Sequence, residues 1–234
     1  MFLFLKLYTA HLFGDFVFQF DELYRLKTKS HLGHVLHVLI HLLVSLVLVI
    51  PYWKYPFIFK FIGVICFVHL IQDILKYKLQ KNIKWMFPAY MLDQLFHFLS
   101  LCSIFLFPIS GLAERFTGNP TLESFYNEPS VTLYFIAAIW TTFGVTYCLH
   151  ALRRSYFENT RPDHGITRFE MTYCFIERLT ATFAILLSAP WSILGLSPLI
   201  GVFRLPFKKM RNMTDFMLSY GSAVFLGFLF RLWV

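Results

Sequence analysis

Three histidines, His34, His37 and His41, lie near the start of a long apolar stretch of the chain. Their spacings of three, four and seven residues place the side chains on one face of an α-helix. A four-residue spacing also joins a histidine to an aspartate at three other places, namely His11 with Asp15, His69 with Asp73, and Asp93 with His97. Imidazole and carboxylate groups are the ligands that zinc, iron and manganese accept. Four apolar segments therefore each carry residue types that could bind a metal.

The composition is that of a polytopic membrane protein. Hydrophobic residues make up 57% of the 234 residues and charged residues only 15%, whereas a soluble domain carries about 25% charged residues. The formal net charge of +8 is explained by basic loops beside anionic lipid. We therefore expect an all-α transmembrane helical bundle with membrane lipid as a partner, and no nucleic-acid partner.

A spanning helix needs about 20 mostly apolar residues. The expected spans are 1–20, 32–50, 57–76, 86–107, 131–151, a segment from 171 to 203, and 213–230. Pro190 and Pro198 interrupt the sixth segment, so the count is six or seven spans. Residues 1–234 are expected to form a single integral membrane domain, in which 1–107 form a four-helix bundle with the metal site and 131–234 support it.

The basic loops predict the orientation of the chain. Loops 21–31, 76–85 and 152–169 are rich in lysine and arginine, whereas loop 108–130 is not. Placing the basic loops in the cytoplasm puts the N-terminus outside. The first residues lack a basic start and a small-residue cleavage site, so the first segment is expected to be a retained helix.

The three His/Asp pairs and the histidine triplet converge in depth under this topology. At 1.5 Å per residue they all fall within a slab roughly 3–17 Å below the cytoplasmic boundary. A bundle can build a metal site from facing helices in this way. The metal ligands predicted from spacing and depth are His11, Asp15, His34, His37, His41, His69, Asp73, Asp93 and His97.

The three aspartates need compensation inside a membrane. A lone aspartate at mid-helix costs about 2.5–3.5 kcal/mol on insertion scales, and a structural metal site supplies on the order of 10 kcal/mol. Few lysines or arginines lie within these segments, so salt bridges are not expected there. Zinc is the first choice of divalent metal, with manganese or iron as alternatives, and nine candidate ligands leave room for two ions. Separate His–Asp hydrogen bonds without a metal remain the alternative.

These motifs carry a family resemblance. Residues 11–19 (HLFGDFVFQ), 69–76 (HLIQDILK) and 92–97 (LDQLFH), with Lys27 or Lys29 and the His37/His41 helix, resemble bacterial integral membrane proteins known as domain of unknown function 3307. The resemblance covers residues 8–100. Glu177-Arg178 resembles a Glu-Arg pair of that family, although Glu170 and Cys174 replace expected glycines. The helical ligands are also distantly similar to those of membrane-bound metal-dependent hydrolases. A bacterial inner membrane location is what the resemblance implies.

The first functional hypothesis is a membrane-embedded metal-dependent hydrolase acting on a phosphoester or lipid head group. Metals polarise the scissile bond and lower the pKa of a bound water. Asp73 or Asp93 could act as general base. Arg178, together with Arg161 and Arg168, could bind a phosphate.

The main alternative is a transporter or channel for a metal ion or proton, because intramembrane histidines and aspartates mark such pathways. Haem-based electron transfer and a purely structural role in helix packing are two further alternatives. The sequence leaves the oligomeric state open, a homo-oligomer included.

Overall fold

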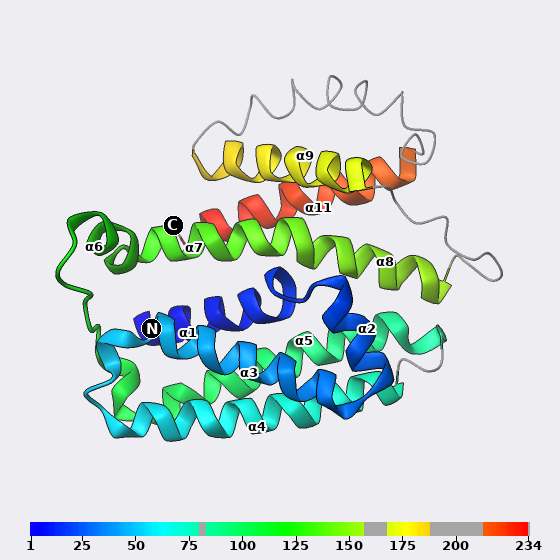
Figure 1. Ribbon diagram of the computed structural model, residues 1–234. Helices are drawn as coiled ribbons and strands as arrows, with labels where there is room; N and C mark the ends of the chain where they lie inside the picture. The colour runs from blue at the N-terminus through cyan, green and yellow to red at the C-terminus, as the bar shows by residue number, and fades with distance from the viewer. Residues whose placement is uncertain (80–82, 157–167, 188–212, 234) are drawn as a thin grey trace. The chain divides into compact units, whose positions relative to one another are not determined.

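The computed structural model describes residues 1–79, 83–156, 168–187 and 213–233. These residues form helices and turns, with no strand among them (Figure 1). The chain divides into two compact units, Met1–Phe135 and Ile136–Val234, and each is described by itself. The proline-interrupted segment at 190–203 and Arg161 lie outside the described residues.

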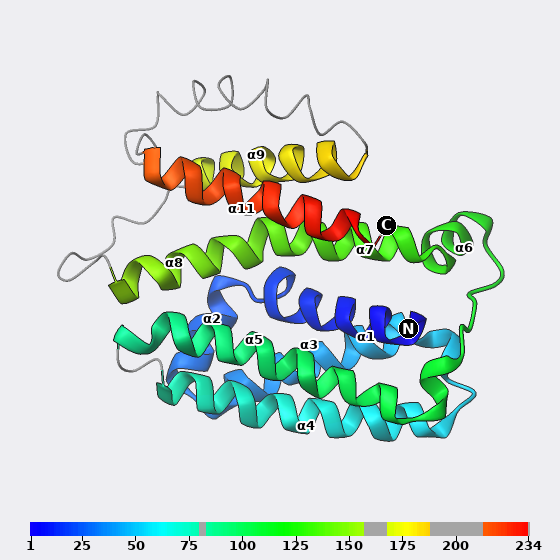
Figure 2. The ribbon, with the colours of Figure 1, turned by 180° about the vertical axis from the view of Figure 1, so that it is seen from behind.

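The first unit is built around four helices, α1 (Phe2–Leu12), α3 (His31–Leu48), α4 (Pro56–Leu79) and α5 (Met86–Cys102). Helix α1 packs against α3 and α5, α3 packs against α4, and α4 packs against α5. These helices lie side by side in both views of the ribbon (Figures 1 and 2). The short helix α2 (Asp21–Lys29) packs against α3.

Helix α3 has its polar face inside and its apolar face outside. Its buried residues are Gly33, His34, His37 and His41, whereas Leu39 and Leu43 are exposed. This is the reverse of a surface helix in a soluble protein, and it is explained if lipid contacts the outer face. The burial pattern therefore agrees with the membrane class expected from composition.

Four helical stretches are long and apolar enough to cross a membrane. They are His31–Leu48, Pro56–Leu79, Met86–Leu106 and Pro129–Tyr156. The expected first span is shorter than predicted, because the helical run from Phe2 ends at Val17. In the last helix, Met213–Arg231, the apolar stretch that could be assessed, Phe216–Arg231, is shorter than 18 residues. Among the described residues, four spans are thus supported by length and composition.

The end of the bundle near the N-terminus is closed by polar contacts around a buried tyrosine. The hydroxyl of Tyr52 donates to the carbonyl of Leu112 at 2.9 Å and accepts from the amide of Glu114 at 3.1 Å. The carboxylate of Glu114 in turn accepts from Lys54 at 2.7 Å and from the Tyr55 hydroxyl at 2.6 Å. These bonds fix the segment after α5 to the turn between α3 and α4.

The second unit contains α8 (Val145–Tyr156), α9 (Arg168–Leu186) and α11 (Met213–Arg231). Helix α7 (Pro129–Ile139) crosses the boundary and continues through the π-helical turn η6 (Trp140–Gly144) into α8. Helices α9 and α11 pack together through a small core of Ala181, Ile185, Tyr220 and Ala223.

Candidate metal centre

Four helices of the first unit direct histidines and aspartates into the bundle. All nine ligands predicted from the sequence are buried, none with more than 7% of its surface exposed. Helix α1 and the turn that follows it contribute His11 and Asp15. Helix α3 contributes His34, His37 and His41. Helix α4 contributes His69 and Asp73, and helix α5 contributes Asp93 and His97. The predicted side chains therefore share one interior, within which they form distinct groups.

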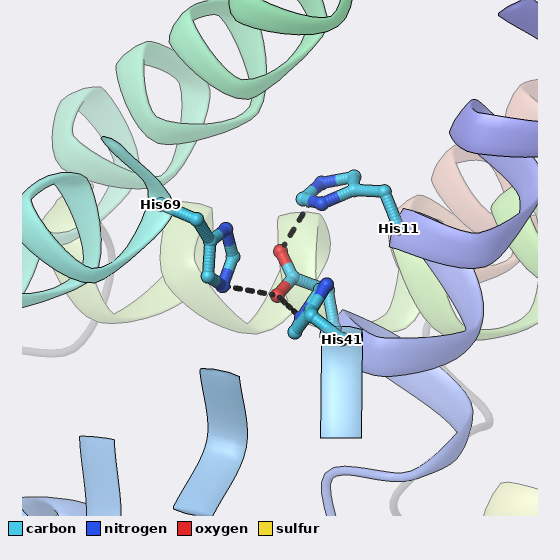
Figure 3. A group of neighbouring side chains, drawn as sticks. His11, His41 and His69 are labelled. Carbon is cyan, nitrogen blue, oxygen red and sulfur yellow. Dashed lines mark hydrogen bonds and ion pairs between the residues drawn. The ribbon is translucent and has the colours of Figure 1, made fainter. Parts of the chain in front are cut away.

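The first group surrounds Asp15. Its Oδ1 lies 3.1 Å from Nε2 of His41 and 3.6 Å from Nε2 of His69, and its Oδ2 lies 3.5 Å from Nε2 of His11. Figure 3 shows the three imidazoles pointing toward one another. One ligand atom from each of these four residues lies within 4.8 Å of the others. Three imidazoles and one carboxylate are a sufficient donor set for a four-coordinate zinc.

Further imidazoles crowd the same space. The ring centroids of His41 and His69 are 4.0 Å apart, those of His69 and His97 are 4.3 Å apart, and those of His11 and His97 are 4.8 Å apart. Nε2 of His37 lies 3.1 Å from Asp15 Oδ1. His37 is thus placed to donate a hydrogen bond to the carboxylate and to orient it, as partners of metal ligands commonly do.

Several buried ring nitrogens make no hydrogen bond. They are both nitrogens of His69, both nitrogens of His97, and Nδ1 of His37. Each unsatisfied buried polar atom costs about 1–3 kcal/mol, so unbonded nitrogens from three helices need a common explanation. A cation bound among the imidazoles would supply partners for those that ligate it, and the residues present therefore fit a metal ion.

A second group consists of Asp15, Asp93 and His97, again with one ligand atom of each within 4.8 Å of the others. Nζ of Lys76 lies 2.7 Å from Oδ2 of Asp93, and the amide of Gln94 donates to the same oxygen at 3.1 Å. Oδ1 of Asp93 accepts no hydrogen bond. Asp93 therefore has one oxygen held by Lys76 and Gln94, while the other lies 3.4 Å from Nδ1 of His97 and is available to a ligand or a proton.

Asp73 belongs to neither group. Its Oδ1 lies 2.9 Å from Nζ of Lys27, and its Oδ2 lies 2.6 Å from Nδ1 of His34. Burial lowers the pKa of the Lys27 ammonium group, and the charge of Asp73 opposes this change. The expectation that lysines would not pair with the aspartates is therefore wrong for Asp73 and Asp93. Both lysines lie near segment ends, and their long side chains reach inward to the carboxylates.

Asp15 is positioned by a π-helical turn, η1 (Phe13–Val17), which continues α1. A π-turn contains one residue more per hydrogen-bonded ring than an α-turn, and such turns are frequent at functional sites. Gly14 brings the backbone of this turn against His41, because a Cβ atom at position 14 would lie 2.5 Å from Cε1 of the imidazole. The sequence pattern did not predict this turn.

A cavity of about 20 Å³ borders the imidazoles of His11, His41, His69 and His97. This volume is enough for one water-sized occupant. The remaining lining is mostly apolar and comprises Leu7, Ser45, Phe61, Ile62, Ile65, Cys66, Gln72, Ser100 and Leu101. The metal-ligand cluster therefore has a small space beside it that is polar on one wall and largely apolar elsewhere.

Arg178 lies in the second unit and is buried there. Its Nη1 donates to the carbonyls of Thr141 and Thr142 at 3.2 and 2.9 Å, and to the hydroxyl of Thr146 at 2.9 Å. Because the carbonyls belong to the π-turn η6, where the regular helical bonding pattern is interrupted, Arg178 stabilises that turn. Binding of a phosphate by Arg178 stays a prediction, and the side chains of Arg161 and Arg168 are outside the described part of the chain.

Sequence reasoning missed three polar partners of the aspartates: Lys27, Lys76 and Gln94. A signal existed for Lys76, which follows Asp73 by three residues and so shares a helix face with it. Gln94 is adjacent to Asp93 and donates to Asp15 as well, at 3.4 Å. Lys27 offered no such spacing, because α2 and α4 are far apart in sequence.

Residues 3–119, half of the chain, match the family described as Protein of unknown function (DUF3307). The chain belongs to this family. The matched range contains all nine predicted ligands and both lysine partners, so the bundle with its buried cluster is the DUF3307 part of the protein. No curated protein and no solved structure matches the chain. The comparisons thus give no support to the distant similarity to metal-dependent hydrolases.

Proposed function

We propose that this DUF3307 protein is a membrane-embedded, metal-dependent hydrolase that acts on a phosphoester, lipid head groups included. The supporting observation is the buried group of His11, Asp15, His41 and His69, whose ligand atoms lie within 4.8 Å of one another. Zinc is the first candidate, and manganese and iron accept the same donors.

The roles of the surrounding residues follow from their contacts. A divalent metal, when bound, polarises the phosphorus–oxygen bond and lowers the pKa of a water molecule. The water oxygen forms a bond to phosphorus while the ester bond to the leaving oxygen breaks. Asp93 is the proposed general base, because its Oδ1 accepts no hydrogen bond and can take the proton from water and return it to the leaving oxygen, with Nδ1 of His97 3.4 Å away. Asp73 suits this role less well, since both of its oxygens are engaged by Lys27 and His34.

The membrane placement is part of the same proposal. In this proposal the chain crosses a bacterial inner membrane six or seven times, with its basic loops in the cytoplasm and its N-terminus outside, so that the metal centre lies near the cytoplasmic face. The four helical stretches of spanning length support the class of protein. Membrane lipid is then the surrounding partner and a candidate source of substrate.

A transporter of metal ions or protons is the second candidate, favoured by the intramembrane position of the ligands. The cavity argues against it. Beyond the imidazoles its walls are mostly apolar, and only Ser45, Cys66, Gln72 and Ser100 offer further ligand atoms to a dehydrating ion. Liposome flux separates the two functions, because a hydrolase moves no ions.

The metal centre is tested by elemental analysis of detergent-purified protein. We expect bound divalent metal in the wild type and a clearly lower metal content in His69→Ala, since removal of a ligand lowers the affinity at least about tenfold. His31→Ala is the matched control, because His31 lies on the same bundle but is exposed. Equal metal content in all three proteins would exclude this centre.

The reaction is tested with phosphoester and lipid substrates in the presence of zinc, manganese or iron. We expect Asp93→Asn to keep its metal while kcat falls about 10²–10⁴-fold, as is typical when a general base is removed. Absence of turnover by metal-loaded wild-type protein on every such substrate would refute the hydrolase.

A further inference from the structure

The cavity beside the metal centre has room for one water molecule. Its volume is about 20 Å³, and a cavity of this size holds a water when about two to four polar groups can bond to it. His11, His41 and His69 of the first group line the cavity, and so does His97. Nδ1 of His97 lies 3.4 Å from Oδ1 of Asp93. An occupant therefore lies beside the proposed metal ligands and borders an imidazole that contacts Asp93.

Gln72 lines the same cavity and has an acceptor atom that is unused. Its Oε1 is buried and accepts no hydrogen bond from the described residues. Its Nε2 donates to Oγ of Ser100 at 3.2 Å, and that hydroxyl donates in turn to the carbonyl of Phe96 at 2.5 Å. Because the single hydroxyl proton of Ser100 is engaged by the main chain, Ser100 can accept from the amide but not donate to it. The amide nitrogen of Gln72 therefore faces Ser100, and Oε1 is left for another donor.

A water molecule supplies the hydrogen bonds that these atoms lack. It can donate to Oε1 of Gln72. It can also donate to, or accept from, the ring nitrogens of His69 and His97, which make no hydrogen bonds within the described chain. An apolar occupant would leave all of these buried polar atoms unpaired, which is unfavourable. The size and the polar wall of the cavity thus both favour water.

We propose that this cavity holds the water consumed in the hydrolysis and that Gln72 is the residue that positions it. The role of the water rests on the proposed function, whereas its presence in the cavity does not. A hydrogen bond to Oε1 of Gln72 restricts the motion of the water, and such restriction lowers the entropic part of the reaction barrier. An amide suits this task because it does not titrate, so it orients the water without competing with Asp93 for the proton.

A crystal structure of the 234-residue chain in which ordered waters are visible tests the water site. In the wild type we expect a water within hydrogen-bonding distance, about 2.8 Å, of Oε1 of Gln72. Gln72→Leu removes the acceptor and should lack this water, whereas Gln72→Glu keeps an acceptor oxygen and should retain it. Because Gln72 belongs to neither group of ligand atoms, all three proteins should contain equal amounts of metal.

Steady-state kinetics on a phosphoester substrate test the positioning role. We expect kcat of Gln72→Leu to fall about 10²-fold with an unchanged KM, because the water is misplaced while the groups that bind substrate remain. Ser100→Ala is the matched control for a purely structural role. It breaks the hydrogen bond between α4 and α5 but keeps Oε1 of Gln72, so it should lower kcat much less than Gln72→Leu does.

A dry cavity in the wild type, a water retained in Gln72→Leu, loss of metal from Gln72→Leu, or an equal loss of kcat in Ser100→Ala would overturn the inference. If Gln72→Leu does not fold, the wild-type structure decides alone, because the inference requires a water on Oε1. A water in place in protein that hydrolyses no phosphoester would refute the hydrolase and the role of the water but keep the water site. Hydrolysis with a dry cavity would keep the hydrolase and refute the water site.

Discussion

At the scale of single residues, Asp15 is the member on which the centre depends. Three imidazoles from different helices lie within 3.6 Å of its oxygens. It is also the only one of the three aspartates in the centre whose described ion-pair contacts are all with histidines. A cation is therefore needed most at Asp15. The backbone position of Asp15 determines whether its carboxylate lies close enough to the imidazoles to share a metal with them.

Gly14→Ala tests that position. The added Cβ would lie 2.5–2.7 Å from three ring atoms of His41, so the imidazole or the π-turn must move. We expect metal affinity to fall at least about tenfold, because a ligand is displaced, while the protein still folds. Metal titration measures the change. Gly63→Ala is the matched control, since nothing lies within 4 Å of a Cβ there. Unchanged affinity in Gly14→Ala would show that His41 is not a ligand.

At the scale of elements, the segment after α5 depends on one carboxylate. Hydrogen bonds from Lys54 and Tyr55 lower the pKa of Glu114 below its ordinary value. The ionised form is thus favoured in the folded state, and its stabilising effect is complete above the ordinary pKa of about 4.3. It is lost as the pH falls through the lower folded-state pKa.

Hydrogen exchange of the amides around residues 112–116, corrected for intrinsic rates, measures this effect. We expect protection to decrease as the pH is lowered below about 4. Glu114→Gln should have reduced protection that no longer changes with pH in this range. A pH-dependent loss of equal size in Glu114→Gln would assign the effect to another group.

Helix periodicity explains why much of the centre could be predicted. Spacings of three and four residues place side chains on one face whatever the tertiary structure, so His37 and His41, or His69 and Asp73, were expected inside. The partition into groups could not be predicted in this way. It depends on Lys27 and Lys76, which approach from segment ends, and on the π-turn at Asp15, for which no simple sequence signal exists.

At the scale of the whole molecule, the apolar stretches predicted the helices better than the number of spans. Apolar residues indicate a helix, but the first helical run ends at Val17. The chain then changes direction and continues as the amphipathic helix α2. The composition gave no sign of this early end. The role of Arg178 was also beyond the sequence, because its carbonyl partners are more than 30 residues away.

Cysteine labelling tests the membrane orientation. Ser124→Cys on α6 (Pro120–Asn127) and Lys78→Cys on α4 are both exposed positions. With the basic loops in the cytoplasm, we expect an impermeant maleimide to label Ser124→Cys in intact spheroplasts and Lys78→Cys only after permeabilisation. Wild-type protein, with its four cysteines, gives the background. The reverse pattern would place the metal centre near the outer face.

The pairing of Lys27 with Asp73 and of Lys76 with Asp93 also bears on how the protein is made. Two of the three buried carboxylates pair with a lysine of the same chain. A newly synthesised chain therefore brings most of the positive charge that neutralises its carboxylates into the bilayer with it. Only Asp15 lacks a lysine partner among its described ion-pair contacts and would be neutralised by an external cation. On the proposed function, insertion of the bundle would therefore not require the metal, which could bind afterwards.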